Sequence, residues 1–196
     1  MHCLFGYGSL ICHDSRSRTG LSGAALAVEV AGIARHWAVP VPDYQATAVG
    51  ALEDPQSQCC GVIFQVDDAN LARFDEREQG YNRIPLPWHQ VRSLDTSPLP
   101  TEYPLWAYVG KGVEPPSPKQ PIMQTYVDVI LHGCLQFNED FARRFLQTTQ
   151  SWQHLLDDRH NPGYPRALNN PALAPAVDEL LWQELPDVIQ ERRKKA

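Results

Sequence analysis

The sequence predicts an α+β fold, in which a small, curved or barrel-like mixed β-sheet is covered by packed helices. The first two-thirds of the 196-residue chain contain mainly β-branched and aromatic runs, separated by clusters of Pro, Gly, Asp and Asn. The last third contains mainly segments whose apolar residues recur at helical spacing. Because strands come first and helices later, the order of the elements favours an α+β domain.

Five runs are expected to form strands. They cover residues 28–41, 46–52, 60–66, 84–94 and 105–109. Four prolines lie within or beside these runs, namely Pro40, Pro42, Pro85 and Pro87. Because proline has no N–H to donate to a neighbouring strand, we expect them at strand ends, edges or bulges.

Four segments in three groups are expected to form helices. The first covers residues 68–78. The second group consists of 122–135 and the segment that follows it, 139–149, and the last segment begins at residue 176. Asp67 or Asp68 is expected to cap the first helix, and Gly80 to stop it. Pro186 is expected to kink or divide the last helix. The proline-rich stretch 112–121 is predicted to be an irregular loop that lies over a pocket.

Length and composition predict one domain with an appendage. Residues 1–150 are expected to form the domain, and residues 151–196 a helical extension packed on it. The formal net charge is −6, with 17 basic and 23 acidic residues. This balance argues against nucleic acid as a partner, since binding phosphates needs a concentrated basic face. The basic run 192–195 is interpreted as a solvated helix end.

The chain is expected to work in the cytoplasm. No apolar stretch is long enough to cross a bilayer, so no membrane contact is expected. Gly6 and Gly8 interrupt the first apolar run too early for a signal peptide. The five cysteines are an odd number, and Cys59 and Cys60 are adjacent, which does not suggest a disulfide framework. The sequence does not predict an oligomeric state.

A glycine-rich segment, Gly6-Tyr7-Gly8-Ser9-Leu10, follows a short apolar strand and is a candidate ligand-binding loop. Its two glycines are expected to permit positive φ and a close approach of the backbone to a ligand. Successive N–H groups in such a turn suit a carboxylate or a developing oxyanion. The spacing matches neither the dinucleotide fingerprint, nor the phosphate-binding loop, nor the elbow that would make Ser9 a nucleophile. An ordinary tight turn is the alternative.

Glu78 is the candidate catalytic residue. At about 100° per residue, it falls on the same helix face as the apolar Leu71 and Phe74. Glu76 and Arg77 point to either side of this face, where water is expected. Burial and the negative end of the helix dipole are both expected to raise the pKa of Glu78, toward the range that suits a general base.

Two alternatives compete with this interpretation of the helix. Asp75 lies at the edge of the same face and is a second candidate carboxylate. Glu78 would otherwise form a structural ion pair with an arginine, for instance Arg83 or Arg166.

Together these segments resemble the γ-glutamylcyclotransferase-like family, which includes ChaC-type and AIG2-like proteins. Segment 5–10 resembles the substrate loop of that family, and segment 74–81 resembles the segment with its catalytic glutamate, at the position of Glu78. Residues 121–133, with Tyr126 and Gly133, are similar to a later helix whose tyrosine lines the pocket. The resemblance extends over residues 3–135.

The resemblance implies the corresponding small barrel-like α+β fold and a cyclising acyl transferase or lyase that needs no cofactor and no metal. It implies a small-molecule substrate, namely a γ-glutamyl amine, a γ-glutamyl amino acid or glutathione. This substrate would be converted to 5-oxoproline, with release of the attached amine or amino acid. Glu78 would act as general acid and base. The implied substrate-binding residues are Gly6, Tyr7, Gly8, Ser9, Leu10 and Tyr126.

Other clusters carry less functional signal. His2-Cys3 and Cys12-His13 lack the spacing of a zinc finger or ribbon. Cys134 is interpreted as a small buried hydrophobe rather than a reactive thiol. Arg35 is expected to be an exposed or snorkelling arginine on a strand.

Several points stay open at this stage. A non-catalytic domain of the same fold, which binds a small carboxylate or a protein partner, is the main alternative function. A γ-glutamyl-processing enzyme of a biosynthetic pathway is another. The tail residues Trp152, Arg159 and 164–166 lie outside the resemblance and have no assigned role, and the sequence does not identify the leaving group.

Overall fold

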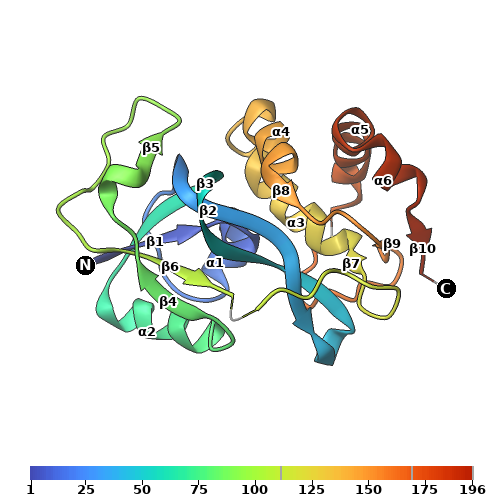
Figure 1. Cartoon of the computed structure of the whole chain (residues 1–196), viewed down its shortest axis with the longest axis horizontal. Helices are drawn as coiled ribbons and strands as arrows, with labels where there is room; N and C mark the ends of the chain where they lie inside the picture. The colour runs from blue at the N-terminus through green and yellow to red at the C-terminus, as the bar shows by residue number, and fades with distance from the viewer. Residues whose placement is uncertain (111, 169, 196) are drawn as a thin grey trace.

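A long two-stranded ribbon runs through the middle of the molecule in the computed structural model of the chain (Figure 1). It is formed by β2 (Leu26–Val41) and β3 (Ala46–Val66), which pair antiparallel. The N-terminus, several short strands and helix α2 (Asp68–Arg77) lie on one side of the ribbon, and the later helices lie on the other. The structure describes residues 1–110, 112–168 and 170–195.

Seven strands of the described chain form an open, mixed sheet. Its order is β4-β6-β1-β3-β2-β5, and β8 pairs with β2. The remaining bounds are β1 His2–Gly6, β4 Asn82–Pro85, β5 Val91–Ser93, β6 Leu105–Val109 and β8 Thr149–Gln150. β1–β6 and β2–β8 are parallel pairs, and the others are antiparallel. The sheet is curved but not closed, and the predicted α+β class is confirmed.

β3 is a single strand of 21 residues, so the prediction of two strands over 46–52 and 60–66 is wrong. In the register with β2, residues 54–57 have no partner and bulge out opposite Gly32. Gly32 has a φ of +82°, which glycine tolerates readily. The turn-forming residues 54–57 are therefore absorbed as a β-bulge within one strand.

Residues 84–94 were expected to form one strand, and this expectation is also wrong. They contribute to β4 and β5, which pair with different strands and are separated by a 3₁₀ helix, η3 (Trp88–Gln90). Pro85 is the last residue of β4, and Pro87 directly precedes η3. Both prolines stand where no ladder N–H is required, as predicted. β6 has the bounds expected for 105–109.

The helices follow the predicted pattern with small shifts. Their bounds are α1 His13–Ser17, α3 Gln124–Leu135, α4 Glu139–Thr148, α5 Ala174–Glu184 and α6 Pro186–Gln190. The Asp67 side chain caps α2 by accepting from the N–H of Asn70 at 2.7 Å. Pro186 begins a new helix, which confirms that it divides the last segment. The short helix α1 was not predicted.

A second, three-stranded sheet joins the tail to the start of α3. Residues 122 and 123, expected to be helical, form strand β7 (Ile122–Met123) instead. β7 pairs with β9 (Leu155–Asp157), which also pairs with β10 (Arg193–Lys194). Helix α5 contacts both α3 and α4. The tail therefore contains strands as well as the expected helices.

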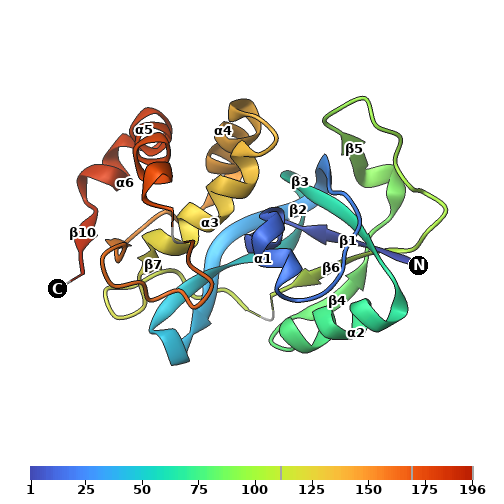
Figure 2. The ribbon, with the colours of Figure 1, turned by 180° about the vertical axis from the view of Figure 1, so that it is seen from behind.

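Helix α3 packs directly against the glycine-rich segment. The residues after Gly8 form a 3₁₀ helix, η1 (Ser9–Ile11), which contacts both α1 and α3 (Figure 2). A Cβ atom at Gly133 would lie 2.5 Å from the backbone N and Cα of Cys12. Only glycine permits this approach, which seats the C-terminal part of α3 against the end of η1.

The five cysteines are buried and free. Burial raises the pKa of Cys134 well above its ordinary value, which confirms its interpretation as a small core residue. Within the described residues, no cluster of three or more His, Cys, Asp and Glu side chains could hold a metal ion. None of the described helices is long and apolar enough to cross a membrane.

Candidate functional site

A pocket of about 280 Å³ lies between the glycine loop, the end of α2, the β2–β3 turn and the tail. Ser9 comes from the loop, Arg77 and Glu78 from α2, and Tyr126 from α3; residues 163–166 form the wall from the tail. The stretch 112–121, expected to cover a pocket, does not line this one. Residues 163–166 of the tail form the covering wall of this pocket instead.

A smaller inner pocket of about 40 Å³ adjoins the first. It is lined by residues 5–10 of the loop, together with Val49, Glu78, Tyr81, Tyr108 and Tyr126. Ser9, Glu78 and Tyr126 line both pockets. The structure thus brings the predicted site residues of the loop, α2 and α3 together at one place.

The backbone carbonyls of loop residues 7–10 accept hydrogen bonds from other groups of the protein. The carbonyl of Tyr7 accepts from Arg35 at 3.1 Å, and that of Leu10 accepts from Arg16 at 2.8 Å. The carbonyls of Gly8 and Ser9 accept from the N–H groups that follow in the 3₁₀ turn. In contrast, the N–H groups of residues 7–10 donate to no described residue. The loop therefore offers a row of donors of the kind that binds anions.

The glycines of the loop serve close packing and not positive φ. Among the described glycines, only Gly32 has a positive φ, so the expected left-handed conformation of Gly6 and Gly8 is wrong. A Cβ atom at Gly6 would lie 2.8 Å from the Cβ of Leu10, because the chain folds back on itself there. Gly6 is therefore needed for the tight return of the chain into η1.

Glu78 is the C-cap residue of α2 and points into the pocket. Its N–H donates to the carbonyl of Phe74 at 2.9 Å, and its own carbonyl accepts from the N–H of Tyr81 at 2.8 Å. Its side chain is 15% exposed. Burial raises the pKa of Glu78, and the neighbouring charges of Arg77 and Arg166 oppose this shift without reversing it. The direction agrees with the prediction.

Arg77 was expected to face water, and this expectation is wrong. Its side chain is 13% exposed, and its Nε lies 3.0 Å from Oε1 of Glu78. Its terminal nitrogens donate to Ser9 Oγ at 3.0 Å and to Thr19 Oγ1 at 2.7 Å. Segment 9–19, which includes α1, packs against this end of α2 and excludes the solvent that periodicity alone predicts there. Glu78 therefore has an arginine partner, which is neither of the two considered from the sequence.

Tyr126 lies in an aromatic cluster beside the loop. Its ring packs on Tyr164 with a centroid distance of 4.6 Å, and edge-on against Trp37 at 5.5 Å. A Cβ atom added at Gly8 would lie 3.4 Å from its hydroxyl oxygen. Burial, followed by the nearby Tyr164 and Glu78, raises the pKa of Tyr126. The phenol therefore stays neutral at pH 7 and is able to donate a hydrogen bond.

Tyr7, Tyr81 and Tyr108 also line the inner pocket. The Tyr7 hydroxyl donates to the carbonyl of Tyr108, and the Tyr81 hydroxyl donates to the carbonyl of Val49 at 3.2 Å. Burial raises the pKa of both Tyr7 and Tyr81 well above the ordinary value. Tyr81 was not singled out in the sequence, although its position three residues after Glu78 is a local signal that was available.

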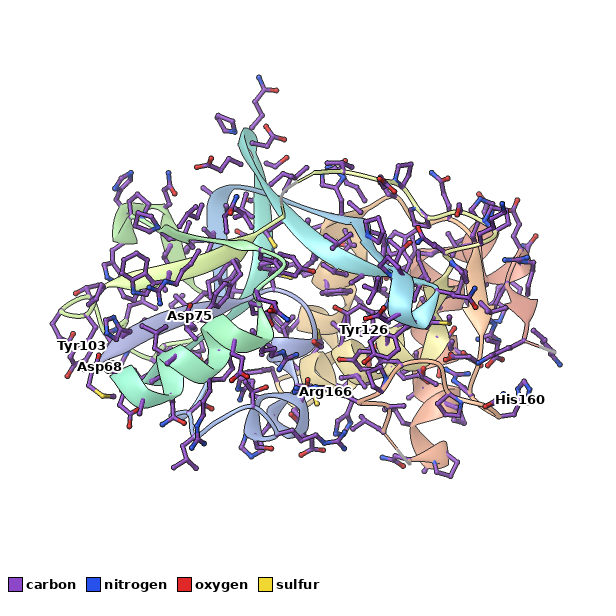
Figure 3. All side chains as sticks on the ribbon, turned by 90° about the horizontal axis from the view of Figure 1, so that it is seen from below. Asp68, Asp75, Tyr103, Tyr126, His160 and Arg166 are labelled. Atoms are coloured by element: carbon purple, nitrogen blue, oxygen red, sulfur yellow. The ribbon has the colours of Figure 1, made fainter. Side chains whose placement is uncertain are left out.

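Asp75, the second candidate carboxylate, is engaged elsewhere. One of its oxygens accepts from the Tyr108 hydroxyl at 2.8 Å, and the other pairs with Arg83 at 2.9 Å. Asp75 lines neither of the two pockets. Figure 3 labels it on α2, apart from Tyr126 and Arg166, which lie near the centre of the view.

Arg35 was expected to be exposed or snorkelling, but it is fully buried. Besides the Tyr7 carbonyl, its guanidinium donates to the carbonyl of Cys60 at 2.6 Å and to that of Phe145 at 3.0 Å. It also donates to the hydroxyl of Thr149 at 2.7 Å. The sequence gives no signal for this, because the acceptors from α4 and β8 lie more than 100 residues away.

Asp158 fixes the tail wall of the pocket. This fully buried carboxylate accepts from the N–H and the hydroxyl of Thr125 at 2.9 and 2.7 Å, and from the N–H of Gly163 at 2.6 Å. It thereby ties residues 163–166 to the start of α3.

We expect Asp158→Ala to lower the free energy of unfolding by about 3 kcal/mol, since it leaves three donors without their acceptor. Denaturant unfolding measures this loss. The matched change Asp187→Ala, at an exposed carboxylate in α6, is expected to cost less than about 1 kcal/mol. Equal losses in the two variants would contradict the assigned role of Asp158.

Residues 4–126 match the family model described as Gamma-glutamyl cyclotransferase, AIG2-like. The chain belongs to this family. The match covers more than half of the 196 residues and includes the glycine loop, Glu78 and Tyr126. Membership supports γ-glutamyl cyclotransferase activity in general. The tail wall of the pocket, residues 163–166, lies outside the matched region. A comparison with curated proteins gives no match.

Solved structures share the γ-glutamyl cyclotransferase fold. A structure of a γ-glutamyl cyclotransferase superposes with a TM-score of 0.60 at 12% identity, over 91% of this chain and 98% of the other. A crystal structure of an uncharacterized protein from Homo sapiens gives 0.59 at 12% identity, over 90% and 97%. YkqA from Bacillus subtilis gives 0.51 at 16% identity, over 76% of this chain and 55% of its own. At such identities the likeness establishes the fold alone.

Proposed function

We propose that the protein converts a γ-glutamyl amine, a γ-glutamyl amino acid or glutathione to 5-oxoproline. The observation that carries the proposal is the meeting of Glu78 with the glycine loop, since Ser9, Glu78 and Tyr126 line both parts of the pocket. A carboxylate of raised pKa beside a row of free N–H groups supplies a proton acceptor and an anion-binding surface in one place.

Glu78 acts as general base and then as general acid. It takes a proton from the substrate α-ammonium, and the freed amine attacks the γ-carbonyl carbon of the same molecule. The new C–N bond closes the ring, and the carbonyl oxygen takes the negative charge. When the carbonyl re-forms, the bond to the leaving nitrogen breaks, and Glu78 returns the proton to that nitrogen. The ring nitrogen loses its second proton to the released amine, which departs as an ammonium.

The loop and the tyrosines hold the substrate in the shape that reacts. Tyr7, Gly8, Ser9 and Leu10 bind the glutamyl end and the developing oxyanion through their N–H groups, and Gly6 lines the inner pocket beside them. Tyr126 closes the pocket beside them. Since the nucleophile and the electrophile belong to one molecule, the protein needs no nucleophilic side chain, and a near-attack conformation supplies much of the rate.

The proposed reaction needs no cofactor or metal, because it consists of proton transfers and one intramolecular acyl transfer. We place it in the cytoplasm, since five free, buried thiols fit a reducing compartment. Residues 151–196 are proposed to extend the 1–150 domain and to complete its pocket with residues 163–166.

A second function is favoured by the Arg77–Glu78 ion pair. This pair, at 3.0 Å, gives Glu78 a structural role that a non-catalytic binding domain would also retain. Such a domain would bind a small carboxylate ligand or a protein partner at the same loop without turning it over.

The two functions are separated by a substrate panel. The purified chain is incubated with glutathione, several γ-glutamyl amino acids and several γ-glutamyl amines, and 5-oxoproline is measured. We expect product from at least one class. No product from any of them, at substrate concentrations well above millimolar, would favour the binding domain.

A further inference from the structure

The mouth of the pocket is rich in arginine. A shallow hollow, which we call the arginine hollow, is lined by Arg18, Thr19, Arg73, Glu76, Arg77 and Arg166. Arg77 and Arg166 also line the main pocket, so the two hollows meet there. Four guanidinium groups against one carboxylate make this hollow positive, although the whole chain has a net charge of −6.

Arg77 and Arg166, which line both hollows, differ in how many of their N–H groups donate hydrogen bonds within the protein. Arg77 contacts Glu78, Ser9 and Thr19, as described above. Arg166 donates only through Nη1, to the Ser15 carbonyl at 3.0 Å and to Thr19 Oγ1 at 2.9 Å. Among the described residues, no carboxylate lies within ion-pair distance of Arg166. Its Nε and Nη2 donate to no described acceptor, so one edge of the guanidinium is available.

Arg166 is held where a substrate would pass. Residues 163–166 are anchored by Asp158 and by the Tyr126–Tyr164 ring contact, so the arginine is attached to a fixed wall. Burial and then the nearby Arg77 lower the pKa of Arg166, and the opposing charge of Glu78 does not reverse this shift. A carboxylate bound there would relieve the repulsion and accept charge-assisted hydrogen bonds.

We propose that Arg166 binds a carboxylate carried by the leaving group, so that γ-glutamyl amino acids or peptides are preferred over γ-glutamyl amines. This inference rests on the proposed function. The glutamyl end lies at the loop and the scissile bond at Glu78, and the leaving group then extends along Tyr164 toward the arginine hollow. A leaving group without a carboxylate gains nothing from Arg166.

The test compares two substrates that differ only in this carboxylate, γ-glutamyl-alanine and γ-glutamyl-alaninamide. We expect the wild-type kcat/KM to be at least about tenfold higher for γ-glutamyl-alanine. Arg166→Gln is expected to lower kcat/KM about 10- to 100-fold for γ-glutamyl-alanine, and by less than about threefold for the amide. Arg193→Gln, at an exposed arginine of β10, is the matched control and should change neither value.

Equal wild-type kcat/KM for the two substrates would overturn the proposal. An equal loss for both in Arg166→Gln would also overturn it, because that result is expected of an arginine that only tethers residues 163–166 to Ser15 and Thr19.

A binding measurement tests the carboxylate subsite independently of whether the protein is an active cyclotransferase. Calorimetry on the Glu78→Gln variant compares the affinities of γ-glutamyl-alanine and its amide without turnover. Tighter binding of γ-glutamyl-alanine, lost on adding Arg166→Gln, supports the carboxylate subsite even if the wild-type chain forms no 5-oxoproline. Equal affinities would overturn the subsite, whether or not the chain is an enzyme.

Discussion

Glu78→Gln is expected to lower the rate of 5-oxoproline formation about a thousandfold or more. General acid–base catalysis contributes ~10²- to 10⁴-fold, and here one carboxylate serves both proton transfers. Glutamine keeps the size and polarity of the side chain but has no basic oxygen. The measurement is kcat/KM with the best substrate of the panel. Retained turnover in the variant would exclude Glu78 as the base.

The pH dependence follows from the raised pKa of Glu78. The base must be deprotonated, so kcat/KM should fall on the acid side of the profile. The inflection is expected above pH 4.3, roughly the value of an unperturbed glutamate, because burial holds the proton more tightly. A profile that stays flat down to that pH would contradict the assignment.

Stability measurements exclude misfolding as the cause of lost activity. The folded state binds a proton at Glu78 more tightly than the unfolded chain does, so ionisation of Glu78 destabilises the fold as pH rises through its folded pKa. Glu78→Gln removes this penalty. We therefore expect the variant to be at least as stable as wild type at pH 7, with a smaller difference at pH 4. Glu53→Gln, at an exposed glutamate of β3, should leave both activity and stability unchanged.

The parts of the site that sequence alone predicted are those set by local periodicity. Three- to four-residue spacing along α2 places Glu78 on the same helix face as Leu71 and Phe74, and in the structure the Glu78 side chain does point inward, into the pocket. The glycine loop was found because a strand runs directly into it. Tyr126 came only through the family resemblance, since a tyrosine on an apolar helix face is also an ordinary core residue.

The parts that sequence missed depend on contacts between distant segments. Arg77 is covered by residues of the N-terminal segment. One of them is Ser9, which accepts a hydrogen bond from Arg77 although it lies 68 residues earlier in the chain. The Tyr164–Tyr126 contact joins the tail to α3, close to where β9 of the tail pairs with β7. Residues 54–57 have the composition of a turn, yet the long pairing of β3 with β2 overrides that preference. None of these contacts has a local signature.

Arg35→Met is expected to lower the free energy of unfolding by about 4 kcal/mol. Methionine fills much of the same volume, so the loss comes mainly from the hydrogen bonds. Arg35 donates to three backbone carbonyls and two hydroxyls, and all of these acceptors are neutral. Each buried acceptor left without a donor costs ~1–3 kcal/mol, with partial relaxation reducing the sum. Denaturant midpoints measure the change, and Arg193→Met, at an exposed position, is the matched control.

The same substitution should also affect the loop. The carbonyl of Tyr7 and the N–H of Gly8 belong to one peptide plane and point in opposite directions. When Arg35 holds that carbonyl at 3.1 Å, it therefore also sets the direction of the Gly8 N–H. In Arg35→Met, kcat is expected to fall even after correction for the folded fraction, because a donor to the oxyanion is no longer fixed. An unchanged unfolding midpoint, or an unchanged kcat per folded molecule, would show that Arg35 does not support the loop in this way.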